Sequence, residues 1–207
     1  PFDLSLTVPA GDQALANTIA TSTKPAGKGW KTVSFAPTLP LPTYLVAYAA
    51  GPWDVVDVPA MPATPQRPAA TPLRGIAAQG QGPRITPALD QTPAIIAALE
   101  DYYAFGYPFD KLDLVAAPDF SAGAMENPGF VTFRDWLLLL DKDSPAENVQ
   151  RSFNTNAHEL AHQWTGDTVT MAWWDDLWLN EAFATWMQQK ITMQLHPEYR
   201  ANLDRIG

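Results

Sequence analysis

Residues Asn156–Glu181 read NAHELAHQWTGDTVTMAWWDDLWLNE and contain the pattern H-E-x-x-H. On a helix, His158 and His162 lie about 40° apart around the axis and one turn apart along it, so both imidazoles can reach one metal ion. Glu159 lies close enough to reach a water molecule on that ion without being a ligand. Glu181 follows after 18 further residues and is the natural third ligand, delivered from a following helix. Two histidines and a carboxylate leave a fourth position open, as a catalytic zinc site requires.

The short pattern alone is weak evidence, because it also arises by chance and because paired histidines on a helix can be ordinary hydrogen-bonded residues. The context here is more specific. The chain has three histidines, and two of them fall within the pattern. Bulky residues flank the pattern, and the third acidic candidate stands in the sequence WLNE. Together these features favour a metal site over a structural pair of histidines.

Three segments carry a resemblance to a known family: HELAHQW, WWDDLWLNEAFATW and the pentapeptide GAMEN at Gly123–Asn127. They resemble the aminopeptidase N family of zinc metallopeptidases, which belongs to the gluzincins. GAMEN is the more specific signal, because many zinc peptidases share H-E-x-x-H and few carry both motifs. The resemblance is densest over about residues 112–190. It implies one zinc ion (Zn2+) per chain, held by His158, His162 and Glu181.

The resemblance also implies roles for the other candidate residues. Glu159 would be the general base that takes a proton from the attacking water and passes it to the leaving amine. Glu126 would bind the free α-amino group of a peptide substrate, which would make the enzyme an exopeptidase. The rest of the substrate-binding segment would be Gly123, Ala124, Met125 and Asn127, with the backbone around the first two lying along the substrate. Without that context, Glu126 would be interpreted as a solvated loop carboxylate.

The composition indicates a globular protein of one or two domains, with 207 residues, 46% of them hydrophobic and 17% charged. The net charge of −9 argues against a nucleic-acid partner and mildly favours cationic groups, such as the amino terminus of a peptide, near the site. The sequence contains no run of 18 apolar residues, so it predicts no membrane span. The absence of cysteine excludes disulfides and thiol catalysis but leaves the compartment open between cytoplasm, periplasm and secretion.

The hydrophobic pattern predicts an α+β protein in two parts. Residues 1–70 read as the end of an antiparallel β-sandwich domain followed by a connector, and residues 71–207 as the N-terminal half of a thermolysin-like catalytic domain. Alternation and turn residues predict four strands in the first part: Phe2–Val8, Thr32–Ala36, Tyr44–Ala50 and Val55–Val58. The proline-rich segment Pro59–Pro72 is interpreted as the connector or as an irregular edge.

The second part shows helical signals around the motifs. The pair Thr92-Pro93 predicts a helix start, and Gly106 predicts its end. The segment Ser144–Glu147 reads as a capping box, so the helix carrying the two histidines would start there and run to about Trp164. Gly166 would then terminate it. Strands are predicted at Lys111–Ala116, Phe130–Phe133 and Trp136–Leu140, with GAMEN in the loop at Pro118–Pro128.

Several aromatic and polar residues near the motifs have less specific interpretations. Six of the eight tryptophans lie between Trp136 and Trp186, and most are expected to pack around the two helices. The third histidine, His196, is expected to be a surface residue. Hydrogen bonds to the metal ligands could come from any of four residues near the motif: Asp175, Asp176, Asn180 and Thr185.

The resemblance also predicts that this chain is an internal fragment. Family members are usually several times longer and carry a tyrosine, some tens of residues after the third ligand, that stabilises the oxyanion. Tyr199 is too close to Glu181 to match it. An opening segment with a second amine-binding residue and the helical domain that covers the site also lie outside the chain. We therefore expect the 207-residue chain to hold its metal, to turn over peptides poorly and to self-associate through exposed apolar surface.

Three hypotheses follow from the sequence. The first is an aminopeptidase, represented by part of its chain. The second is another zinc hydrolase on the same scaffold, either an endopeptidase, which GAMEN disfavours, or an epoxide hydrolase. The third is a zinc-binding domain with a structural role and little turnover, which Glu159 disfavours for the parent enzyme because a structural site needs no base.

Overall fold

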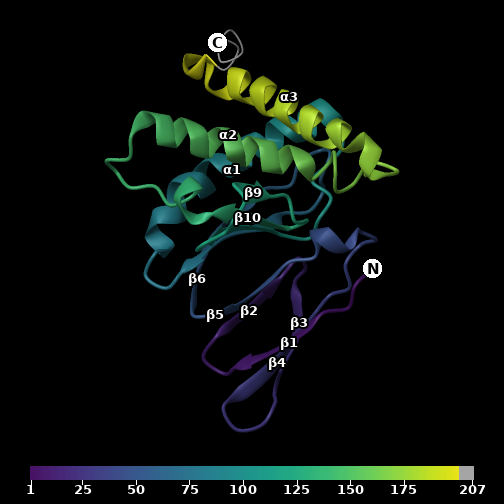
Figure 1. Cartoon of the computed structure of the whole chain (residues 1–207), viewed down its shortest axis with the longest axis vertical. Helices are drawn as coiled ribbons and strands as arrows, with labels where there is room; N and C mark the ends of the chain where they lie inside the picture. The colour runs from purple at the N-terminus through teal and green to yellow at the C-terminus, as the bar shows by residue number, and fades with distance from the viewer. Residues whose placement is uncertain (201–207) are drawn as a thin grey trace.

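The computed structural model describes residues 1–200, which form an α+β structure (Figure 1). The N-terminal strands lie at one end of the molecule, and the helices α1 (Thr86–Tyr103), α2 (Ala146–His162) and α3 (Leu177–Leu195) gather at the other, as Figure 1 shows. A mixed five-stranded sheet lies between them. None of the helices within residues 1–200 has both the length and the apolar character that a bilayer span needs.

The first part of the chain is built from short antiparallel strands, as the alternating pattern predicted. One sheet has the order β1-β4-β3, and β2 pairs with β5 in a second. Their bounds are β1 (Ser5–Pro9), β2 (Gln13–Ala16), β3 (Ala20–Pro25), β4 (Trp30–Phe35) and β5 (Tyr48–Gly51). The strand predicted at Tyr44–Ala50 is only partly correct, because Thr43–Leu45 forms a 3-10 turn before β5 begins. β2 and β3 carry weak apolar patterns and escaped prediction.

The five-stranded sheet has the order β6-β7-β8-β10-β9. β7, β8 and β10 are parallel to one another, while β6 and β9 are antiparallel edge strands. Their bounds are β6 (Trp53–Met61), β7 (Thr71–Ala78), β8 (Leu112–Ala117), β9 (Ala124–Met125) and β10 (Phe130–Arg134). The strands predicted at β8 and β10 are confirmed. The GAMEN segment, predicted to be a loop, itself contributes the edge strand β9.

The main hydrophobic core lies between this sheet and the helices. Val131 and Phe133 of β10 point to the helical side and pack in one cluster with Phe153 and Leu160 of α2. Apolar side chains on one face of α2 therefore fix that helix against the sheet, and burial of each such side chain stabilises the fold by about 1.5–3 kcal/mol. Asn156 of α2 adds a buried hydrogen bond to α1, because its Nδ2 donates to Thr92 Oγ1 at 3.0 Å.

The predicted bounds of α1 were wrong at both ends. The helix begins at Thr86, with Pro87 in its first turn, so an earlier Thr-Pro pair supplies the start and Pro93 lies inside the helix. Thr92 does not cap; its hydroxyl donates to the carbonyl of Ala88 at 2.8 Å. The helix ends at Tyr103, before Gly106. Glycine is needed at position 106 for a different reason: a Cβ there would lie 2.3 Å from the carbonyl oxygen of Gln66.

Two further local predictions were wrong. Trp136–Leu140 is not a strand; Asp135–Leu137 forms a 3-10 turn in which the Asp135 carbonyl accepts from the backbone N–H of Leu138. The apolar run reflects burial of its four leucines and not an extended backbone. The capping box also does not form, because Ser144 Oγ accepts from the Asp141 N–H, and Pro145 occupies the N-cap position. The predicted start of α2 is nevertheless correct to within two residues.

Candidate metal centre

The C-terminal turns of α2 present the histidine pair, as the sequence predicted. The apolar face of the helix is buried in the core, with Ala157, Leu160 and Ala161 each fully inaccessible to solvent. The three candidate groups project from the rest of the same turns. His162 is 1% exposed and Glu159 6% exposed, whereas the side chain of His158 retains 17% exposure. The two histidines therefore reach the site from a helix whose position is already fixed by packing.

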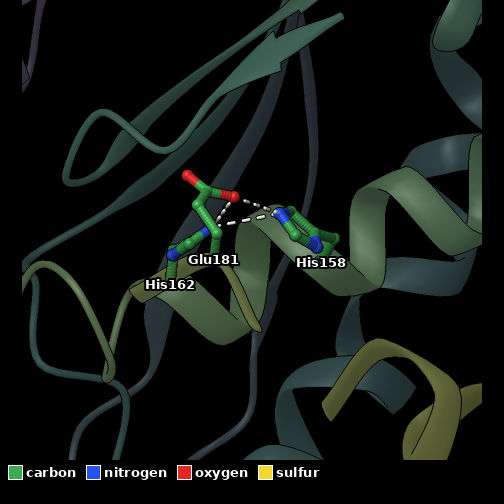
Figure 2. Close-up of side chains that lie close together, drawn as sticks. All are labelled: His158, His162 and Glu181. Carbon is green, nitrogen blue, oxygen red and sulfur yellow. Dashed lines mark hydrogen bonds and ion pairs between the residues drawn. The ribbon is translucent and has the colours of Figure 1, made fainter. Parts of the chain in front are cut away.

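The three predicted ligands point toward one another (Figure 2). His158 Nε2 lies 3.1 Å from His162 Nε2. Glu181 Oε2, from the first turns of α3, lies 3.3 Å from His158 Nε2 and 3.7 Å from His162 Nε2. Ligand atoms about 2.0–2.1 Å from a tetrahedral zinc ion would be roughly 3.3 Å apart. The observed separations therefore fit one zinc-sized ion bound by two imidazoles and one carboxylate.

A second group of possible ligands overlaps with the first. Within residues 1–200, Glu126, Glu159 and His162 also bring one ligand atom each within 4.8 Å of one another. All three are buried, and the set contains a single imidazole. The first group has the donor set typical of catalytic zinc, and Glu181, whose side chain is 54% exposed, leaves that site open to solvent. In that arrangement Glu159 is not among the three candidate ligands and lies next to one of them in the sequence.

The electrostatics of this region favour a cation. Burial raises the pKa of Glu159 to about 8, against the opposing charge of His162, and the charges of Glu126 and Glu181 raise it further. Burial lowers the pKa of His162, but the hydrogen bond to Glu181 and three carboxylate charges outweigh burial and bring that pKa to about 9. Hydrogen bonds from the two histidines hold the pKa of Glu181 below its usual range. Three carboxyl groups thus surround two imidazoles, and a divalent cation would offset their mutual repulsion.

Asn180 connects a predicted ligand to the substrate segment. Its Oδ1 lies 2.9 Å from His162 Nδ1, and the Thr165 carbonyl lies 3.1 Å from the same nitrogen. Both partners are acceptors, so Nδ1 carries a proton, and Nε2 is the ring nitrogen that would face a metal. Of the four residues considered from the sequence, Asn180 is the one that makes this contact, whereas Asp175 and Asp176 are exposed.

The local backbone makes room for Asn180. Gly166 follows α2 with φ +125, a conformation that side-chain-bearing residues rarely adopt. A Cβ on Gly166 would lie 2.3 Å from Asn180 Oδ1. Gly166, predicted to terminate α2, lies beyond the observed end of the helix at His162, and its role is to allow the contact between α3 and the end of α2.

Glu126 is not a solvated loop carboxylate. It is 5% exposed, and its Oε1 accepts from Asn180 Nδ2 at 3.3 Å. Ala124 and Met125, just before it, pair with β10, so one edge of β9 is turned away from the sheet. Asn127 is also buried, and its side chain donates to the carbonyl of Leu45 and accepts from the Thr132 hydroxyl. The segment thus brings an edge strand and a buried carboxylate next to the candidate metal ligands, with Gly123 leading into it.

Three residues near the centre were missed by sequence reasoning. Asp167 is 7% exposed, and burial, followed by the charges of Glu126 and Glu159, raises its pKa well above its usual value. Burial, with the charges of Glu126, Asp167 and Glu181, raises the pKa of Tyr44 to about 12. Gln163 is fully buried. Gln163 and Asp167 adjoin the motif but have no distinguishing spacing, and Tyr44 is far away in the sequence, so no local signal could have identified them.

The expectation that most tryptophans pack around the helices was wrong. Of the six between Trp136 and Trp186, Trp164 is buried at 3% exposure, and the other five are each at least 41% exposed. Three of these five precede or begin α3: Trp173, Trp174 and Trp178. Trp174 contacts Tyr44, with ring centroids 5.3 Å apart. The start of α3 therefore presents aromatic surface beside the candidate site.

His196 is neither buried nor near the metal centre. Its Nδ1 lies 2.8 Å from Glu198 Oε1, and its ring stacks on Tyr199. The predicted surface role agrees with this position. Tyr199 packs against Phe153 in the middle of α2, and its carbonyl accepts from the side chain of Gln150.

A histidine pair, a carboxylate close to both histidines and a buried acid beside them are typical of hydrolytic metal centres. Residues 87–206 match the peptidase family M1 domain, and the chain belongs to this family of metallopeptidases. The resemblance inferred from the motifs is therefore confirmed.

Named relatives cover most of this chain. Aminopeptidase M1-A of Oryza sativa subsp. japonica is 41% identical over 199 residues, which is 96% of this chain and 22% of the relative. Glutamyl aminopeptidase of Mus musculus is 38% identical over 90% of this chain and 19% of its own length. Aminopeptidase N of Acetobacter pasteurianus is 39% identical over 90% of this chain and 51% of its own length. The chain thus spans from about a fifth to about half of the length of these relatives.

Proposed function

We propose that this chain carries the zinc centre of an aminopeptidase, which removes residues from the free amino terminus of peptides. The observation that supports this most directly is the contact chain from His162 through Asn180 to Glu126. A metal centre alone would suit many hydrolases. A buried carboxylate tied to that centre, at the end of an edge strand, suits a substrate with a positive amino terminus.

In this proposal His158, His162 and Glu181 hold the ion. Zinc, when bound, would supply a Lewis acid that polarises the peptide carbonyl and lowers the pKa of a water molecule. Glu159 would take the proton from the attacking water and deliver it to the leaving amine. The raised pKa of Glu159 supports this role, because proton transfer is most efficient when the pKa of the base lies near the working pH.

Glu126 would hold the α-amino group of the substrate in a charge-assisted hydrogen bond. The free edge of β9, with Gly123, Ala124 and Met125, would bind the substrate backbone by adding it as a further strand. Asn127 would support this segment through its buried contacts. Together these residues would place the first peptide bond beside Glu159.

We also propose the finer division of the fold. Residues 71–207 would form part of a thermolysin-like catalytic domain, and residues 1–70 would form the end of a β-sandwich domain with its connector. Within the described residues, β6 of the first part pairs with β7 of the second, so any boundary at residue 70 lies inside a hairpin. The two parts would therefore move as one body.

The exposed tryptophans at the start of α3 support a further proposal about partners. Contiguous apolar surface on a monomer usually marks a contact site. We propose that the parent protein's helical domain covers this surface and that the isolated 207-residue chain self-associates through it. Sedimentation of the isolated chain at increasing concentration tests this. A single monomeric species at all concentrations would contradict it.

Hydrolysis of matched substrates by the full-length protein tests the main proposal. A leucine amide with a free amino terminus should be cleaved, its N-acetylated form should be a poor substrate, and an internal bond of a blocked peptide should stay intact. Glu159→Gln should lower cleavage by about 10²–10⁴-fold, and Glu147→Gln, at an exposed glutamate on the same helix, should leave it unchanged. Efficient cleavage of blocked peptides would instead indicate an endopeptidase. Zinc binding without any turnover would indicate a structural site.

A further inference from the structure

The side chain of Gln163 joins the end of α2 to the proposed substrate-binding segment, Gly123–Asn127. It directly follows His162, is fully buried and has close polar partners on both its amide nitrogen and its amide oxygen. Its Nε2 donates to the Glu126 carbonyl at 2.9 Å and to Asp167 Oδ2 at 3.0 Å. Its Oε1 accepts from the Gly129 N–H at 3.1 Å. The Tyr107 hydroxyl lies 3.4 Å from the same oxygen, but it has one hydrogen and is closer to the Lys111 carbonyl, at 3.0 Å. A glutamine amide offers two donor hydrogens and two acceptor positions, and three of these four have close partners.

Two of these bonds join Gln163 to the backbone on both sides of a short turn. The Glu126 carbonyl precedes the turn and the Gly129 N–H ends it, while Phe130 N–H donates to the Asn127 carbonyl within it. Backbone partners matter because they fix the path of the chain and not only one side chain. Moving Glu126 relative to α2 would break buried bonds and leave unpaired polar groups, which is costly.

The turn itself leaves little freedom for another arrangement. Gly129 has φ +67, and a Cβ there would lie 2.7 Å from the Asn17 carbonyl oxygen. Asn17 in turn donates to the carbonyl of Pro128 at 3.0 Å. The segment is thus held from the first part of the chain on one side and by Gln163 on the other.

The carboxylate of Glu126 has a separate tie to α2, through Asn180 and His162. Asn180 touches a candidate metal ligand, so changing it would also disturb metal binding. Gln163 is bonded to the substrate segment without touching the atoms that would hold the metal. It can therefore be changed to test the position of the segment alone.

We propose that Gln163 is a positioning residue that sets the distance between the amine-binding Glu126 and the metal centre, and so restricts cleavage to the first peptide bond. This inference rests on the aminopeptidase function proposed above. An amino group displaced by one methylene, as in a β-amino acid, would then be misplaced for cleavage. Misplacement by about 1 Å can cost roughly 10²-fold in rate. Loosening the segment should reduce this discrimination.

The experiment uses the full-length zinc-loaded protein with two substrates, leucine amide and β-homoleucine amide. Gln163→Met keeps the length of the side chain and removes its polar atoms. Gln163→Asn keeps the amide but is one methylene shorter, so it cannot span both backbone partners. Gln194→Met, at an exposed position of α3, is the matched control. Zinc content and thermal unfolding are measured for every variant.

For both Gln163 variants we expect one zinc per chain and a cooperative unfolding transition. The ratio of kcat/KM for leucine amide to that for β-homoleucine amide should fall by about 10-fold or more, mainly through a lower kcat/KM for leucine amide. The control should keep the wild-type ratio. If the Met variant fails to fold, the Asn variant carries the test.

An unchanged ratio in a folded, zinc-loaded variant would overturn the inference, as would an equal loss on both substrates. Loss of folding in both variants would show that Gln163 is only structural and would also overturn it. Failure of the wild-type protein to cleave leucine amide at all would instead contradict the proposed function. The two failures are therefore distinguishable.

Discussion

The two helices that bring the candidate ligands together are held in very different ways. α2 is embedded between the sheet and the other helices, and it presents His162 and Glu159 from a fully packed turn. α3 begins at the surface, with Leu177, Trp178 and Leu179 each at least 40% exposed, and Glu181 projects from that exposed start.

This difference suggests how the centre is assembled. The histidine pair projects from a turn that the core holds in place, so we expect its geometry not to depend on a metal. The position of Glu181 depends on the buried side of α3, where Asn180 bonds to His162 and Ala184 and Met187 enter the core. We expect changes on α2 to affect chemistry and global stability, and changes at the start of α3 to affect metal retention and local order.

The largest expected effect on activity comes from replacing each of two glutamates, Glu159 and Glu181, by glutamine. Glu159→Gln on α2 should keep one zinc per chain and lower kcat by about 10²–10⁴-fold, the usual contribution of a general base. Glu181→Gln on α3 should lower zinc content as well as activity, because a neutral amide is a weaker ligand for zinc than a carboxylate. Zinc analysis alongside kinetics separates the two. Loss of zinc in Glu159→Gln with full retention in Glu181→Gln would reverse their assigned roles.

A pair of leucines tests the packing difference directly. Leu160→Ala removes a fully buried side chain from α2 and should lower the free energy of unfolding by about 2–5 kcal/mol. Leu179→Ala removes a side chain that is 46% exposed at the start of α3 and should change it by less than about 0.5 kcal/mol. Chemical denaturation of both variants measures this. Similar losses would mean that α3 is covered as well as α2.

Replacing Glu126 tests whether the segment Gly123–Asn127 binds the substrate beside the candidate residues of α2. In the full-length protein, Glu126→Ala should lower kcat/KM for free-amine substrates by about 10- to 100-fold, through loss of one charge-assisted contact. N-acetylated substrates should be poor for the wild type and little changed by the variant. Glu198→Ala, an exposed carboxylate, is the control. If Glu126→Ala cleaved free-amine substrates as efficiently as the wild type, the Glu126 carboxylate would not bind the amino group.

Metal removal is expected to give the smallest and most local change in backbone protection. Chelation should lower the hydrogen-exchange protection of amides near Glu181 at the start of α3, because the metal contact of that side chain is lost. Amides of α2 around Leu160 should keep their protection, since the core holds them. Exchange measured with and without chelator tests this. Equal loss of protection in both helices would show that the metal holds the whole centre together.

The sequence was sufficient to predict that the three candidate ligands lie close together, because much of its evidence is local. The i, i+4 spacing of His158 and His162 and the periodic apolar face of α2 specify one helix turn, which the structure contains. The start of α1 could not be chosen reliably, because Thr86-Pro87 and Thr92-Pro93 give the same signal. The apolar run Trp136–Leu140 was equally ambiguous, since burial alone does not distinguish a strand from a turn.

The remaining parts of the centre depend on contacts between distant segments. Gln163 reaches Glu126 across 37 positions of the sequence, and Asn17 reaches Pro128 across 111. The charge on Glu126 reaches Tyr44 from another element altogether. No local spacing encodes such contacts, so the supporting residues of the site became visible only in the fold. The burial of Glu126 likewise depends on contacts between distant segments.

The most direct test of the account is a crystal structure of the zinc-loaded protein with anomalous data collected at the zinc absorption edge. We predict one strong peak, about 2.0–2.2 Å from His158 Nε2, His162 Nε2 and a carboxylate oxygen of Glu181. Glu159 should lie beside the ion without coordinating it. A peak between Glu126, Glu159 and His162 would contradict the proposed ligand set, and no peak in a zinc-loaded crystal would contradict the metal centre itself.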